Sequence, residues 1–165
     1  MSYYVGITLL FFVALIEVSV LPLFRVYGLQ PNLTLVLLIA WLIIRGEEEA
    51  YVLIPIGGVL LGLVESAPMG TAIIALAPVA VLQEIRGSKL GQGGVAMAIA
   101  FTAMMSVVYN FTYLLVFTLT GESGNWLVAT TDVVLPVTLL NIVVLVPLYF
   151  VFSVVNPRYR RSLYA

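Results

Sequence analysis

The stretch VVLPVTLLNIVVLVPLYFVFSVV, residues 133–155, contains no charged side chain. The stretch VAMAIAFTAMMSVVYNFTYLLVFTLT, residues 95–120, is equally free of charge. A helix needs roughly 20 apolar residues to cross the hydrocarbon core of a bilayer. Both stretches are longer than that, so each is predicted to form a transmembrane helix.

Four further apolar stretches precede these two and are also predicted to cross the membrane, at residues 3–24, 28–44, 50–65 and 71–83. The predicted fold is therefore all-α, a single six-helix transmembrane domain over residues 1–165. An alternative topology joins the third and fourth stretches into one hairpin that never fully crosses. The first stretch is expected to remain as a helix, because it carries Glu17 and lacks both the basic leader and the cleavage site of a signal peptide.

The composition points to lipid as the surrounding medium. The chain has 165 residues, enough for one domain, and 62% of them are hydrophobic while 9% are charged. Typical globular domains are about 45–50% apolar and about 25% charged. A chain without Cys or His lacks thiolate zinc sites, cysteine nucleophiles and Ser–His catalysis. We therefore expect neither an enzyme nor a bound metal or cofactor, and a net charge of −1 gives no general attraction to nucleic acid.

The distribution of basic residues predicts the orientation of the helices. Cytoplasmic loops of membrane proteins are enriched in Lys and Arg. With six spans, one side of the membrane would hold Arg25 alone, and the other would hold Arg45, Arg86, Lys89, Arg158, Arg160 and Arg161. Both termini are therefore expected in the cytoplasm. The acidic run 47–49 and the basic tail could contact cytoplasmic partners or membrane lipids, or serve only as solvated anchors.

Four polar side chains lie within the predicted spans: Glu17, Glu65, Asn110 and Asn141. At about 1.5 Å per helical residue, the first three lie roughly 21–23 Å from the cytoplasmic helix ends, and Asn141 lies about 12 Å below the outer surface. All four are therefore predicted in a polar layer in the outer half of the bilayer. This layer could open outward as a cavity, or its members could simply bond neighbouring helices. Two carboxylates placed close together could not both ionise cheaply.

Two helix faces are predicted to pack against protein. Pro55, Gly58, Gly62 and Glu65 follow steps of three and four, and Gly58-x-x-x-Gly62 is a small-residue pair that permits a close helix approach. The approaching helix could come from this chain or from a partner. In residues 95–120 a polar stripe runs along one side, extended by small residues toward the cytoplasm: Ala96, Ala100, Thr102, Ser106 and Asn110.

Two segments resemble the MreD family, the small membrane subunits of the bacterial cell-elongation machinery. The first is Pro31-Asn32-Leu33, which leads an apolar run ending in Arg45-Gly46-Glu47. The second is the glycine-rich run GGVLLGLVES, residues 57–66, followed by Pro68-Met69-Gly70. The resemblance covers about residues 28–82. It departs from the family at Glu65, where the family usually shows Asp.

The resemblance implies a multi-pass protein of the cytoplasmic membrane of a rod-shaped bacterium. It implies a fold similar to the substrate-binding subunits of energy-coupling-factor transporters. The expected function is a non-enzymatic scaffold that binds an MreC-like single-span partner through intramembrane packing. Through that partner it would join MreB-like filaments with a RodA-type glycosyltransferase and its transpeptidase, supporting peptidoglycan synthesis and cell shape. The alternative function is a substrate-binding subunit of a small-solute, vitamin-type transporter.

Overall fold

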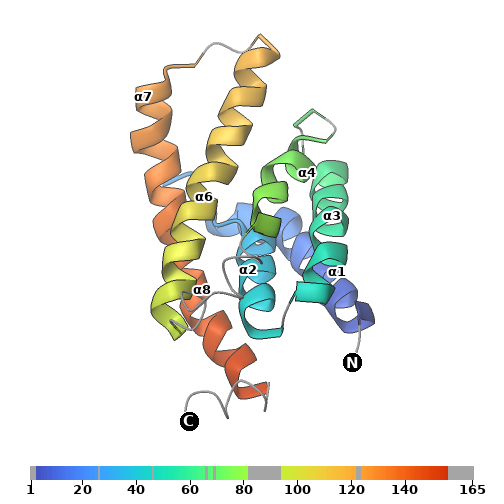
Figure 1. The fold of residues 1–165 in the computed structure, drawn as a ribbon. Coiled ribbons are helices and arrows are strands. Elements are labelled where there is room, and N and C mark those ends of the chain that lie inside the picture. Colours follow the sequence, from blue (N-terminus) through green and yellow to red (C-terminus); the bar gives the residue numbers. More distant parts are fainter. Residues whose placement is uncertain are drawn as a thin grey trace.

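The computed structural model describes residues 3–25, 27–45, 47–65, 67–68, 70–81, 94–121 and 124–155 (Figure 1). Every regular element within these ranges is a helix, as the sequence predicts. Five of the basic residues used to predict orientation (Arg86, Lys89, Arg158, Arg160 and Arg161) lie outside the described residues. For Arg45 and for residues 47–49 only the path of the backbone is described.

The chain forms ten helical segments within the described ranges. They are, in order, α1 (Tyr3–Ser19), η1 (Leu21–Phe24), α2 (Leu33–Arg45), α3 (Glu47–Val64), α4 (Thr71–Leu76), η2 (Ala77–Val81), α6 (Gly94–Leu119), α7 (Trp126–Ala129), η4 (Thr130–Val134) and α8 (Leu135–Val155). The segment η4 has π-helical hydrogen bonding and joins α7 to α8 without a break.

Two helices are long and apolar enough to cross a membrane. One is α6, with 26 residues, and the other is the continuous helix Trp126–Val154, with 29 residues. They correspond to the two uncharged stretches, residues 95–120 and 133–155. The remaining apolar helices are shorter, at 10–17 residues: Tyr3–Ser19, Leu33–Ile43, Tyr51–Leu63 and Thr71–Val81. Helix length therefore supports two of the six predicted spans, and the other four remain predictions.

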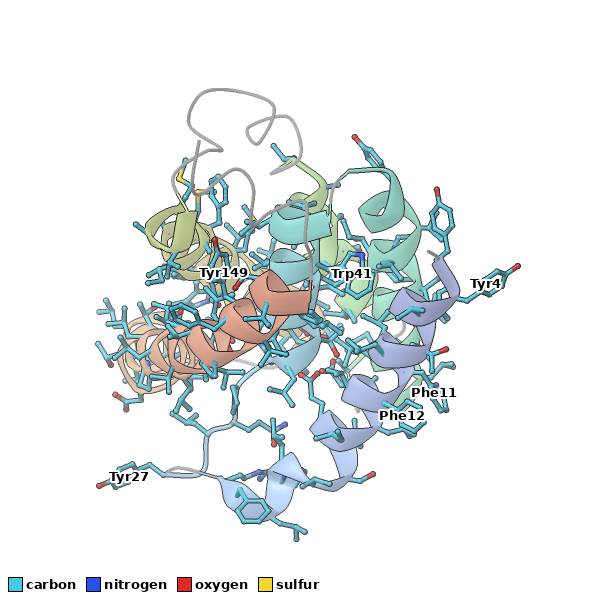
Figure 2. All side chains as sticks on the ribbon, turned by 90° about the horizontal axis from the view of Figure 1, so that it is seen from below. Tyr4, Phe11, Phe12, Tyr27, Trp41 and Tyr149 are labelled. Atoms are coloured by element: carbon cyan, nitrogen blue, oxygen red, sulfur yellow. The ribbon has the colours of Figure 1, made fainter. Side chains whose placement is uncertain are left out.

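Helix α2 lies at the centre of the bundle. Its residues 35–43 are all buried, with exposed fractions from 0% to 6%. It packs against α1, α3, α6 and α8, while the outer helices contact one another in the order α1, α3, α4, α6 and α8. The end view in Figure 2 shows Trp41 of α2 in the interior, whereas Tyr4, Phe11 and Phe12 project from the outer face of α1. The core is therefore built around one short apolar helix.

The second predicted span, 28–44, is helical only from Leu33 onward. Residues 27–32 form a non-helical connection, in which Tyr27 and Gly28 have positive φ angles of 53° and 82°. Pro31 has no backbone N–H and disfavours the α-conformation of the residue before it. The carbonyl of Asn32 then accepts the first helical hydrogen bond, from the Val36 N–H at 3.1 Å. The Pro-Asn pair therefore marks the start of α2 and not its interior.

The glycine-rich segment packs α3 against α4 within this chain. A Cβ atom at Gly58 would lie 2.7 Å from the Cα of Ile73 in α4, so only glycine fits there. A Cβ at Gly62 would meet nothing within 4 Å. Within the described part of this chain, the small-residue pair thus makes its close approach at Gly58 and not at Gly62.

Pro68 and Gly70 lie at the start of α4. Gly70 precedes the helix with a φ of 92°, a conformation that side chains rarely adopt. The carbonyl of Pro68 accepts hydrogen bonds from the backbone N–H and the hydroxyl of Thr71, at 3.1 and 2.7 Å. This turn fixes the direction in which the chain returns along α3.

The polar stripe of α6 faces protein over part of its predicted length. Thr102 and Ser106 are fully buried, and Asn110 is half-buried. Ala96 and Ala100, in contrast, are not buried, so their assignment to the protein-facing stripe is wrong. A step of four residues back from Thr102 reaches Ala98, which is fully buried. Ala98 therefore extends the buried face.

Replacing Gly58 by alanine should destabilise the bundle, because the new methyl group would overlap the backbone of Ile73. We expect the free energy of unfolding to fall by about 1–3 kcal/mol, the usual cost of overpacking. The matched control is Gly62→Ala, which meets open space. It should leave stability unchanged or raise it by up to about 1 kcal/mol, because alanine favours helix. Unfolding by SDS in mixed micelles measures both, and equal losses would contradict this packing.

Candidate functional site

Of the four polar residues predicted to share a layer, Glu17 and Asn141 bond to the beginning of α2, whereas Glu65 and Asn110 bond to residues of α6. They come from four different parts of the bundle: Glu17 from α1, Glu65 from the end of α3, Asn110 from α6 and Asn141 from α8. Each of them makes a hydrogen bond within the bundle. We refer to these residues and their bonding partners Asn32, Thr34, Ser106, Tyr109 and Tyr113 as the polar cluster.

Glu17 caps α2 from a neighbouring helix. Its Oε2 atom accepts hydrogen bonds from the backbone N–H of Thr34 at 2.9 Å and from the Thr34 hydroxyl at 2.6 Å. The first backbone N–H groups of a helix have no partner within that helix, and they attract negative charge. Glu17 is only 3% exposed and Thr34 is fully buried. Glu17 therefore supplies acceptors that water cannot provide at this depth of the bundle.

Asn141 ties α8 to both α2 and α6. Its Oδ1 accepts a hydrogen bond from the backbone N–H of Asn32 at 2.7 Å. Its Nδ2 donates to the hydroxyl oxygen of Ser106 at 2.7 Å. Asn141 and Ser106 are both fully buried. One amide thus satisfies a second backbone donor at the start of α2 and links three helices.

Asn110 has a more local role. Its Nδ2 donates to the backbone carbonyl of Ser106, one turn earlier on the same helix, at 2.7 Å. That bond places the Asn110 amide next to the residue that Asn141 contacts. It does not by itself connect two helices.

Glu65 forms the outer part of the cluster with two tyrosines of α6. The Tyr113 hydroxyl donates a short hydrogen bond to Glu65 Oε2, and the Tyr109 hydroxyl donates to the Tyr113 oxygen at 3.1 Å. The rings of Tyr109 and Tyr113 lie 4.8 Å apart between centroids. Tyr109 is 3% exposed, whereas Glu65 and Tyr113 are half-buried.

Glu17 bonds to Thr34, whereas Glu65 bonds to Tyr113, so the two carboxyl groups make separate hydrogen bonds. Among the described residues no group of three or more Asp, Glu, His or Cys side chains is arranged to hold a metal ion. Chemically, the cluster offers carboxyl, amide and hydroxyl groups that bond to helix ends and to one another.

Three residues of the cluster were not identified from the sequence: Thr34, Tyr109 and Tyr113. The tyrosines are four residues apart on α6, which places them on one face, and that spacing was available as a signal. Thr34 gives no comparable signal, because its role depends on a carboxylate that is 17 residues away in the chain.

Among the residues that the structure describes, three buried polar side-chain atoms have no hydrogen-bond partner. They are Gln30 Oε1, Thr102 Oγ1 and Thr138 Oγ1. Thr138 precedes Asn141 by less than one turn of α8, and Thr102 precedes Ser106 by about one turn of α6. The bonded amide and hydroxyl thus have unbonded hydroxyls as near neighbours on their own helices.

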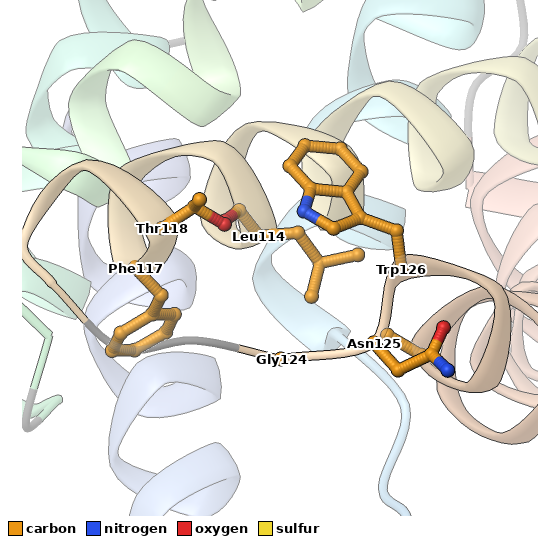
Figure 3. Close-up of a pocket in the computed structure, with 7 residues that line it drawn as sticks. Leu114, Phe117, Thr118, Gly124, Asn125 and Trp126 are labelled. Atoms are coloured by element: carbon orange, nitrogen blue, oxygen red, sulfur yellow. The ribbon is translucent and has the colours of Figure 1, made fainter.

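A separate cavity of about 210 Å³ lies between the end of α6 and α7. Figure 3 shows the indole of Trp126 on one side of it and Leu114, Phe117 and Thr118 on the other. The Trp126 ring stacks on Phe111, with 6.2 Å between centroids. The cavity contains none of the polar-cluster residues, so it is not an extension of that cluster.

The bonds of Asn141 predict a selective loss of stability. Asn141→Leu keeps a similar side-chain size but leaves the Asn32 N–H and the Ser106 hydroxyl unpaired, and we expect a loss of about 1–3 kcal/mol. The control is Thr138→Val, which removes a buried hydroxyl without a partner and should cost less than about 0.5 kcal/mol. Both are measured by SDS unfolding, and an equal or larger loss for Thr138→Val would contradict the assignment.

The cap on α2 predicts different outcomes for two substitutions of Glu17. Glu17→Gln retains an oxygen that accepts from Thr34, so stability should fall by less than about 1 kcal/mol. Glu17→Leu removes the acceptor and leaves buried donors unpaired, which should cost about 2–4 kcal/mol. The comparison is made by unfolding in mixed micelles. A charge-dependent role would instead make both substitutions equally harmful.

Comparison of the chain with protein-family models, with curated proteins and with solved structures finds no significant match. The geometry of the polar cluster therefore carries the functional interpretation of the chain. The groups of the cluster originate from α1, α3, α6 and α8, and two of these helices bond directly to the start of the buried helix α2. The strongest conclusion from that geometry is that the polar cluster holds the bundle together at the N-terminal end of α2.

Proposed function

We propose that this protein is a non-enzymatic membrane scaffold, an MreD-like subunit that binds a single-span, MreC-like partner and supports peptidoglycan synthesis during cell elongation. The observation that carries the proposal is that two buried polar side chains, Glu17 and Asn141, form hydrogen bonds inside the bundle. Glu17 and Asn141 are 3% and 0% exposed and bond to α2 and α6. Hydrogen bonds of this kind stabilise the helical bundle. They leave its apolar exterior available for contact with other helices.

The exterior of the bundle supports this function. Large apolar side chains are exposed along several helices, among them Leu63 of α3, Ile74 of α4, and Leu139 and Val143 of α8, with exposed fractions of 60–68%. In a bilayer such surfaces face lipid or the helices of other proteins, and helices associate there through packing and local polar contacts. A scaffold with short connections would bind its partners mainly through these faces.

The proposed topology is six spans in a bacterial cytoplasmic membrane, with both termini in the cytoplasm. The first turn of α1 and the last turn of α8 lie at the same end of the bundle, which favours an even number of crossings (Figure 1). The short helix α2 would complete its crossing through the non-helical connection that precedes it. Non-helical backbone is tolerated at membrane depth where protein covers it, and Gln30, Pro31 and Asn32 are half-buried.

The alternative is a solute-binding subunit of a vitamin-type transporter. Its specific support is the set of unpartnered buried atoms, Gln30 Oε1, Thr102 Oγ1 and Thr138 Oγ1, which a bound polar solute could satisfy. Such a solute would be retained through purification. Mass spectrometry of denatured, freshly purified protein would detect it.

Partner recovery and cell shape test the scaffold proposal directly. The tagged chain, expressed in its own host in place of the native copy, should retain the MreC-like protein through detergent purification and keep the cells rod-shaped. Glu17→Gln and Glu65→Gln, which preserve the acceptor oxygens, should each change partner recovery by less than about twofold, because the polar cluster stabilises the bundle through hydrogen bonds.

Either of two results would overturn the scaffold proposal. One is that cells remain rod-shaped after depletion of the chain. The other is that the wild-type protein retains a stoichiometric small solute but no MreC-like protein. The second result would favour the transporter subunit.

A further inference from the structure

The outer ring of helices is incomplete between α1 and α8. Each of these helices packs against the central helix α2. Around α2, α1 packs against α3, α3 against α4, α4 against α6 and α6 against α8, but within the described residues α8 does not pack closely against α1. The non-helical connection before α2 lies on the α8 side of this opening, because Asn32 bonds to Asn141. An apolar groove of about 530 Å³ follows this edge of α8, lined by Tyr27, Leu29, Asp132, Pro136, Leu139, Leu140 and Val143.

The groove has the form of a helix-packing face. Pro136, Leu139, Leu140 and Val143 recur at steps of three and four, so they make one stripe along α8. Leu139 and Val143 are 64% and 67% exposed, so nothing in the described chain covers the middle of the stripe. A straight apolar stripe beside a gap in the ring accommodates one more helix.

Asp132 places a single charge at one end of this stripe. Its carboxylate is exposed and accepts a hydrogen bond from the Thr131 hydroxyl at 2.9 Å. It forms no ion pair with any residue in the described part of the chain. A carboxylate beside apolar membrane surface is costly unless it is hydrated or paired. It also repels the phosphate of a lipid headgroup, so it disfavours lipid as the specific occupant.

Two local features set this end of the groove apart. Asp132 belongs to the π-helical segment η4, and single π-turns inside helices are frequent at functional sites. Tyr27, which lines the same groove, is 97% exposed and has a φ of 53°. A non-glycine residue in that conformation is strained, and such strain clusters at binding sites. Figure 2 shows the Tyr27 side chain projecting away from the body of the protein.

We infer that the groove along α8 receives the single transmembrane helix of a partner protein, which carries a Lys or Arg that pairs with Asp132. The inference rests on the proposed scaffold function and specifies its binding surface. The apolar stripe packs against the partner helix, and Asp132 fixes its axial position. Charge complementarity selects the partner, because a helix without a cation would leave Asp132 unpaired at the interface.

Site-specific photo-crosslinking tests the location. Benzoylphenylalanine is placed at Leu139 or, as the matched control, at Ile74, which is exposed to a similar extent at 60% on α4. Each variant is co-expressed with the MreC-like protein of the same organism in intact cells. We expect the crosslinked partner to be at least about fivefold more abundant from position 139 than from position 74, because photo-crosslinks form only at close contact.

A charge reversal tests the ion pair. Asp132→Lys should lower partner recovery by about fivefold or more, since like charges facing each other across an interface are costly. Thr120→Lys, which adds a lysine to an exposed position at the end of α6, should change recovery by less than about twofold. Exchanging the partner's basic residue for Glu should restore recovery with Asp132→Lys. That restoration also shows that Asp132→Lys remains folded.

The outcomes separate this inference from the proposed function. Recovery of the partner with equal crosslinking at positions 139 and 74, or without sensitivity to Asp132→Lys, would overturn the groove and leave the scaffold proposal standing. Crosslinks from position 139 to a second copy of this chain, or to lipid alone, would also overturn it. Absence of the partner from every wild-type purification would overturn both.

Discussion

The structure depends on satisfying the N-terminal end of a helix that is buried on every side. Residues 35–43 of α2 are inaccessible and Thr34 at its start is fully buried, so the free backbone N–H of Thr34 has no access to water. Glu17 of α1 provides its acceptor, and Asn141 of α8 provides one for the N–H of Asn32. An unmet donor in an apolar interior costs about 1–3 kcal/mol, so the positions of α1 and α8 are tied to that of α2.

The sequence predicted the helical class and both ends of α6 well, because uncharged runs of that length have few other solutions. It placed the start of the last long helix at residue 133, whereas the continuous helix begins at Trp126 and includes Asp132. It also selected Glu17, Glu65, Asn110 and Asn141, since polar groups in apolar runs need partners. It did not reveal that residues 28–32 are non-helical, although Pro31 was visible. The partnership of Thr34 with Glu17 was equally hidden, because it depends on how two helices are arranged in space.

The glycine pair also shows that spacing along the chain does not predict which helix contacts form. Spacing alone made Gly58 and Gly62 equivalent, but only Gly58 meets the backbone of α4. The difference depends on how α3 and α4 pack in space, which spacing along the chain does not specify. In α6, the alanines assigned to the polar stripe are not buried, whereas Ala98 lies a full step from Thr102 and is buried. Periodicity identifies a face, and packing decides which part of the face is used.

The long separation between Asn32 and Asn141, 109 residues along the chain, has a consequence for biosynthesis. While the ribosome is still making the residues before α8, the start of α2 has its acceptor from α1 but lacks the one from α8. The bundle therefore completes the hydrogen bonding at this helix end only after α8 has been synthesised.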